Sequence, residues 1–102
     1  MKELKFTPEN LQRHLRNDRR TITTTRDSYK GGVGTVFKIE GLGYFVVMRY
    51  EHYSNLQLRE LCKDHYQEEG FPTIGAFINE LEKLYPNAKE FYVYHLMEVF
   101  LE

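Results

Sequence analysis

A glycine-rich segment at residues 30–35, KGGVGT, is the first stretch whose residue types could bind a ligand. A loop that grips nucleotide phosphates has the pattern G-x-x-x-x-G-K-[ST], in which the lysine meets the outer phosphates, and it opens a helix. Here Gly34 runs directly into Thr35, and bulky residues alternate with other types over residues 33–39. That spacing is typical of a strand, so the segment is predicted to be a turn that feeds a strand.

Three arginines, Arg19, Arg20 and Arg26, flank a run of threonines and form a second candidate site. A guanidinium is always charged, and its planar fork suits phosphate or carboxylate groups. Basic residues outnumber acidic ones in the first third of the chain and acidic ones predominate in the rest, although the net charge is only −1. This total argues against a bulk electrostatic nucleic-acid binder and leaves two alternatives, a local anion site or an ordinary solvated face.

The bulk composition of the 102 residues, of which 41% are hydrophobic, predicts a single domain that spans residues 1–102. No apolar run reaches the ~20 residues of a membrane helix, and the first residues lack the apolar centre of a secretion signal. We therefore expect a cytoplasmic monomer without a membrane partner. Cys62 is the only cysteine, which excludes an internal disulfide and a cysteine-rich zinc site, and no metal or cofactor is predicted.

The first two predicted elements are a helix and a strand, and the strand contains the threonines next to the arginines. A helix is predicted to begin at Thr7, a capping residue followed by proline, and to end near Asn17. Residues 20–25 are rich in β-branched types and predict a strand. Its alternation lines one face with hydroxyls, those of Thr21, Thr23 and Thr25.

The remaining patterns predict an α+β fold. Strands are expected at 33–40 and 44–51 around a hairpin turn, helices at 55–70 and within 71–86, the latter ended by Pro86, and a central last strand at 90–100. His65 falls on the apolar face of the second helix and is interpreted as a structural histidine. The expected architecture is a small, mostly antiparallel β-barrel with three helices packed around it.

Four short patterns follow one another in this order: "DRRTITTTRD" at 18–27, "GYFVV" at 43–47, "KDHYQEEG" at 63–70 and "LYPNAKEFYVYHL" at 84–96. Together with the element order they resemble the ASCH domain, a PUA-like β-barrel family, and in particular its small acetylcytidine amidohydrolase branch. The resemblance covers nearly the whole chain. It implies a PUA-like barrel that handles RNA or a modified nucleoside.

Members of that branch use a lysine, a threonine and a glutamate to remove an acetyl group from a modified nucleoside. The resemblance places the threonine at Thr23 and the glutamate at Glu69, with Glu68 as the alternative. The lysine position is occupied by Arg20, and a guanidinium cannot act as a proton-accepting base. Lys30 on the glycine turn is an alternative source of an amine.

Two functions therefore remain open. The preferred interpretation is a module that binds RNA or a modified nucleoside in a basic, threonine-lined cleft, to which Arg19, Arg26 and Lys30 contribute ligand contacts. One extra threonine leaves open whether Thr25 or Arg26 fills the place of the family's signature arginine. The alternative is an amidohydrolase for acetylcytidine-type nucleosides, in which Thr23 and Glu69 carry the chemistry.

Overall fold

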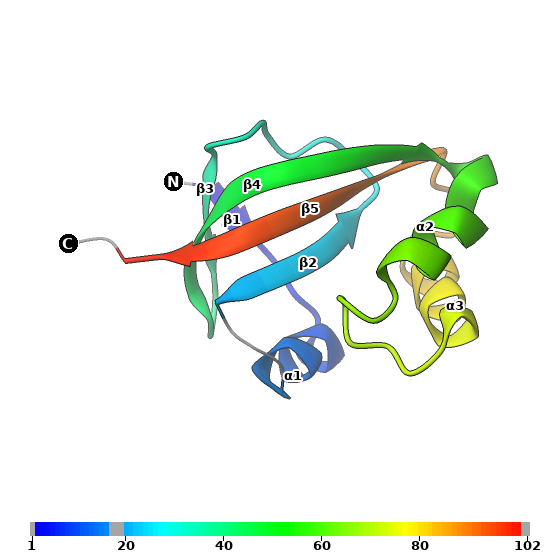
Figure 1. Ribbon diagram of the computed structural model, residues 1–102, viewed down its shortest axis with the longest axis horizontal. Coiled ribbons are helices and arrows are strands. Elements are labelled where there is room, and N and C mark those ends of the chain that lie inside the picture. Colours follow the sequence, from blue (N-terminus) through cyan, green and yellow to red (C-terminus); the bar gives the residue numbers. More distant parts are fainter. Residues whose placement is uncertain (1, 17–19, 101–102) are drawn as a thin grey trace.

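The computed structural model describes residues 2–16 and 20–100, and these form an α+β fold (Figure 1). One five-stranded, mostly antiparallel sheet carries three α-helices and a short 3-10 helix, as predicted apart from the barrel. The elements are β1 (Lys2–Leu4), α1 (Pro8–Arg16), β2 (Thr21–Arg26), β3 (Val36–Ile39), β4 (Gly43–Ser54), the 3-10 helix (Asn55–Gln57), α2 (Leu58–His65), α3 (Ile74–Leu84) and β5 (Glu90–Val99).

The strand order is β1-β3-β4-β5-β2, so β1 and β2 are the two edges. Among the described residues these edges do not pair with each other, and the sheet is not closed; the predicted barrel is therefore not confirmed. The parallel strand β1, paired with β3, was not predicted from the sequence. Three residues are too few to produce a detectable alternation.

The last strand is central, as its apolar pattern indicated. β5 pairs antiparallel with β4 on one side and with β2 on the other, and Figure 1 shows the three strands side by side. Its residues are buried on both faces of the sheet, including Phe91, Val93, Tyr94 and Leu96. Each face of β5 therefore contributes to one of two hydrophobic clusters.

A bulge at Met48 decides which side chains of β4 share a face with β2. Val47 pairs with Leu96, but the next paired residue, Arg49, lies opposite His95. One extra residue in one strand reverses the faces of everything beyond it. Glu51 consequently lies on the same face as His95.

The glycine-rich segment turns inward instead of presenting its amides to a ligand. The Tyr94 hydroxyl accepts hydrogen bonds from the amides of Lys30 (2.7 Å) and Gly31 (3.2 Å), and the Gly34 amide donates to the carbonyl of Val47 (2.9 Å). Gly34 has a φ of 92°, which ordinary strand residues do not adopt. For this reason β3 begins at Val36, three residues later than predicted.

The helices α2 and α3 pack together at the end of the sheet where β4 finishes and β5 starts (Figure 1). His65 lies on the apolar face of α2, as predicted, and is buried there together with Leu61 and Cys62. Burial raises the pKa of the Cys62 thiol to about 12, in keeping with an unreactive apolar role. No helix within the described residues has the length and apolar character needed to cross a membrane.

Candidate functional site

Thr23 lies at the centre of a polar group between β2 and the turn that follows α2. It pairs with His95 of β5, and its Oγ1 lies 3.4 Å from the Nδ1 atom of that histidine. The same hydroxyl donates a hydrogen bond to Oε2 of Glu68 at 3.2 Å. A nearly buried hydroxyl is thus held between a carboxylate and an imidazole.

The structure brings Glu68, the alternative in the sequence analysis, to Thr23. Glu69 points elsewhere: its carboxyl shares a 2.5 Å hydrogen bond with the Thr25 hydroxyl and is almost completely buried. Thr23 and Thr25 lie on one face of β2, as predicted, and each meets a different one of the two adjacent glutamates. The Glu68 side chain remains 43% exposed, so only Glu68 combines contact with Thr23 and access to solvent.

Burial changes the ionisation of Glu69. It raises the pKa of the carboxyl to about 8, although the Thr25 hydrogen bond and the charges of Arg13 and Arg26 act in the opposite direction. Arg13 also donates to the backbone carbonyl of Glu69 at 3.0 Å and lies over the ring of Phe71. These contacts hold the turn after α2 against α1 and β2, so the role they give Glu69 is structural.

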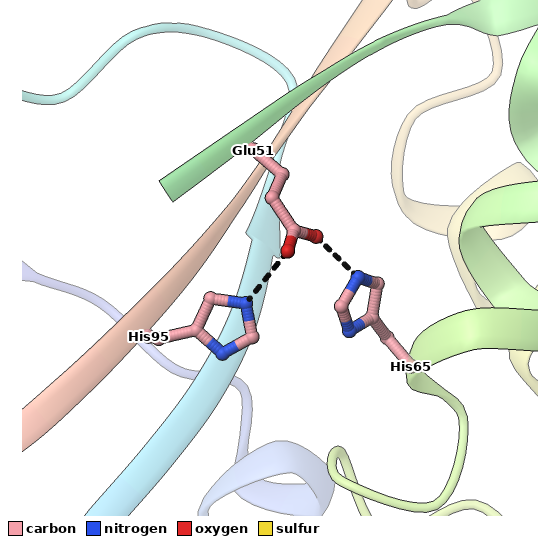
Figure 2. Close-up of side chains that lie close together, drawn as sticks. All are labelled: Glu51, His65 and His95. Carbon is pink, nitrogen blue, oxygen red and sulfur yellow. Dashed lines mark hydrogen bonds and ion pairs between the residues drawn. The ribbon is translucent and has the colours of Figure 1, made fainter. Parts of the chain in front are cut away.

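Glu68 also connects two histidines that the sequence analysis did not assign to a site. Its Oε1 lies 3.3 Å from Nδ1 of His65, and its Oε2 lies 3.5 Å from Nδ1 of His95. On the far side of both rings is Glu51, whose carboxylate oxygens lie 2.5 Å from Nε2 of His65 and 3.7 Å from Nε2 of His95 (Figure 2). The phenol of Tyr53 is 3.2 Å from Nε2 of His65.

The electrostatics of this cluster follow from burial and one exposed arginine. Burial lowers the pKa of His95, and the charge of Arg49 lowers it further. Burial pushes the pKa of Glu51 upward, but its contacts with Arg49 and His65 outweigh this effect and the net shift is downward. Burial and the neighbouring Glu51 raise the pKa of Tyr53 to about 12. Glu51 is therefore held as a carboxylate.

An open pocket of about 430 Å³ gives access to Thr23. Glu68 and His95 line it together with Thr23, and the remaining walls are largely apolar, from Thr21, Ile22, Met48, Leu96 and Met97. A second pocket of about 510 Å³ shares Thr21 and Met97 with the first and is lined further by Arg20, Glu98 and Phe100. Arg20 therefore borders the space next to the Thr23 pocket.

The other predicted basic residues do not line the Thr23 pocket. Arg26 donates to the backbone carbonyl of Lys5 at 2.8 Å and lies over the ring of Phe6. Lys30 belongs to the glycine-rich turn that is bound to Tyr94. Arg19 lies outside the described residues. Within the described part of the chain, Arg20 is thus the predicted cation nearest to this pocket.

Comparisons of the chain with models of known protein families, with curated proteins and with solved structures find no match.

Proposed function

We propose that this protein is a small hydrolase of N-acyl amides that acts on a modified nucleoside of the acetylcytidine type. The observation that carries the proposal is the Thr23 hydroxyl, held by the carboxylate of Glu68 at the wall of an open pocket. A hydroxyl next to a proton acceptor is the arrangement that activates a weak oxygen nucleophile. The resemblance to the amidohydrolase branch of the ASCH family points to the same pair of residue types.

In the proposed reaction Thr23 Oγ1 adds to the acyl carbon while its proton passes to Glu68. The carbon–nitrogen bond then breaks, and the departing amine takes the proton from Glu68. A water molecule hydrolyses the acyl ester on Thr23 in the second half of the reaction and restores the hydroxyl. Overall, one amide and one water yield one carboxylic acid and one amine.

Arg20 is proposed to hold the substrate and not to move protons. Its guanidinium stays charged, and it lines the pocket that adjoins the Thr23 pocket. A nucleoside that occupies both pockets would place a polar or anionic group near Arg20 and its base against Met97 and Phe100, both of which are exposed. This placement also favours a second candidate function, in which the pockets bind a nucleoside or RNA without turnover.

The proposed relation to the ASCH family includes its PUA-like barrel. Support comes from the edges of the sheet: Arg26, at the end of β2, bonds to the carbonyl of Lys5, just after β1. A side-chain link between the edge strands fits a sheet that curls toward closure. Burial lowers the pKa of Arg26, although the nearby Tyr85 and Glu69 favour its charged form.

Incubation with acetylcytidine, followed by chromatography for cytidine, tests the proposal. Turnover is expected from the native protein, and Thr23→Val should abolish it because the replacement keeps the shape and removes the hydroxyl. Thr24→Val is the matched control, since Thr24 is buried, does not line the Thr23 pocket and tolerates a β-branched residue. Nucleoside binding that depends on Arg20 without cytidine release would favour the second candidate function.

A further inference from the structure

We infer that Glu51, His65 and His95 form a binding site for a divalent metal ion, with zinc as the best-matched ion. Figure 2 shows the three side chains converging from β4, α2 and β5. One ligand atom from each lies within 4.8 Å of the other two. Two imidazoles and one carboxylate are a ligand set that zinc takes in proteins.

The distances from the Glu51 carboxylate to the two imidazoles bracket the separation that such an ion imposes on its ligands. Bonds of about 2.0–2.1 Å in tetrahedral geometry separate neighbouring ligands by roughly 3.3 Å. Oε2 of Glu51 lies 2.5 Å from Nε2 of His65 and Oε1 of Glu51 lies 3.7 Å from Nε2 of His95, one distance below and one above that separation. Shifts of about an ångström, within the reach of side-chain rotation, would let both imidazoles and the carboxylate bind one ion.

Glu68 supplies the support that such ligands require. A metal-binding histidine usually donates its other ring N–H to a carboxylate, which fixes the ring and its tautomer. Here the two oxygens of Glu68 face the Nδ1 atoms of His65 and His95 at 3.3 and 3.5 Å. This single carboxylate therefore orients both rings so that their Nε2 atoms point toward Glu51.

The Nε2 atom of His95 gives an independent indication. It is buried and has no hydrogen-bond partner among the described residues, although the Glu51 carboxylate faces it at 3.7 Å. A buried polar atom without a partner is destabilising, and a bound cation would satisfy it. Arg49 contacts Glu51 and opposes a cation there, but its side chain is 59% exposed and can turn to solvent.

The inference goes beyond the proposed hydrolysis and does not require it. The metal titration contains no nucleoside, so failure of one proposal is distinguishable from failure of the other. Zinc chloride is titrated calorimetrically into protein that has been dialysed against a chelator, and cobalt is followed by its visible absorption. One equivalent of zinc is expected to bind, with the cobalt spectrum of a four-coordinate site.

Glu51→Gln and His95→Ala should each weaken zinc binding by well over tenfold, because each removes a ligand. Glu68→Gln should weaken it by about 10–100-fold through loss of ring orientation. His52→Ala is the matched control: His52 neighbours Glu51 in β4 but pairs with Glu90 at 2.8 Å, outside the cluster, and should bind zinc like the native protein.

His65 is buried, and its replacement by alanine would leave a cavity that destabilises the fold. Glu51 is partly exposed, so Glu51→Gln is the substitution on which the test relies. Thermal melts without metal verify that each variant is folded. Native-like zinc affinity in Glu51→Gln and His95→Ala would overturn the inference. The inference would also fail if the native protein bound no zinc in a saturable, one-to-one manner, or if His52→Ala weakened zinc binding as much as the ligand substitutions do.

Discussion

Replacement of Glu69 by glutamine is expected to stabilise the protein at pH 8 and to leave its stability near pH 4.5 unchanged. Burial raises the pKa of this carboxyl from 4.5 to about 8. The folded protein therefore keeps a proton that the unfolded chain releases between these pH values. The stability that depends on this proton is complete below pH 4.5 and is lost as the pH rises to 8.

The expected size of the effect follows from the pKa shift. Each pKa unit corresponds to about 1.4 kcal/mol, so the loss over the whole window is on the order of 4 kcal/mol. Glutamine keeps the shape of the protonated side chain and can accept the hydrogen bond of Thr25, but it cannot ionise. Glu69→Gln should therefore remove this loss.

His14 limits the pH range in which the effect is clearest. Burial lowers the pKa of this histidine from 6.5 to about 4, and Arg13 and Arg26 contribute in the same direction. A lowered pKa in the folded state makes stability fall as the pH drops from 6.5 toward 4. Between pH 6.5 and 8 the contribution of Glu69 is separate, and the native protein should lose on the order of 2 kcal/mol there.

Urea unfolding at pH 5, 6.5 and 8 measures the effect. Glu60→Gln is the matched control, since it removes an exposed carboxyl in the first turn of α2 and should follow the native pH dependence. The free energy of unfolding of Glu69→Gln should change little between pH 6.5 and 8. Parallel curves for the native protein and Glu69→Gln, or a variant less stable than native at pH 8, would refute the reasoning.

Two further substitutions test other parts of the structure. Tyr94→Phe removes a buried hydroxyl that donates to the Gly31 carbonyl at 3.0 Å and accepts from two amides of the glycine-rich turn, so it should cost about 1–3 kcal/mol in urea unfolding. A cost below about 0.5 kcal/mol would contradict this role. Arg20→Lys keeps a positive charge but loses the planar fork beside the Thr23 pocket, so KM for acetylcytidine should rise while kcat changes little. A fall in kcat with an unchanged KM would contradict the substrate-holding role.

The sequence predicted the part of the site that depends on local periodicity. Alternation along residues 20–25 was enough to place Thr23 and Thr25 on one face, because side chains in a strand repeat every second residue. The apolar run at 90–100 was enough to place β5 in the centre of the sheet. Both inferences need only neighbouring residues.

The histidine cluster could not be found in this way, because it depends on register between distant strands. Glu51 reaches the face of His95 only through the bulge at Met48, and no residue type at that position signals a bulge. Glu51, His65 and His95 are also far apart in the sequence and form no recognisable metal-ligand spacing. The choice between Glu68 and Glu69 likewise depends on the turn that ends at Gly70, whose φ is 84°.

The most direct test of the proposed hydrolysis compares these two adjacent glutamates in the same assay. Release of cytidine from acetylcytidine is measured for the native protein, Glu68→Gln and Glu69→Gln at pH 7. Because Glu68, and not Glu69, contacts Thr23 and lines its pocket, Glu68→Gln should lose turnover by about 100-fold or more, whereas Glu69→Gln should retain it. Loss of turnover in Glu69→Gln with native turnover in Glu68→Gln would contradict the proposed site.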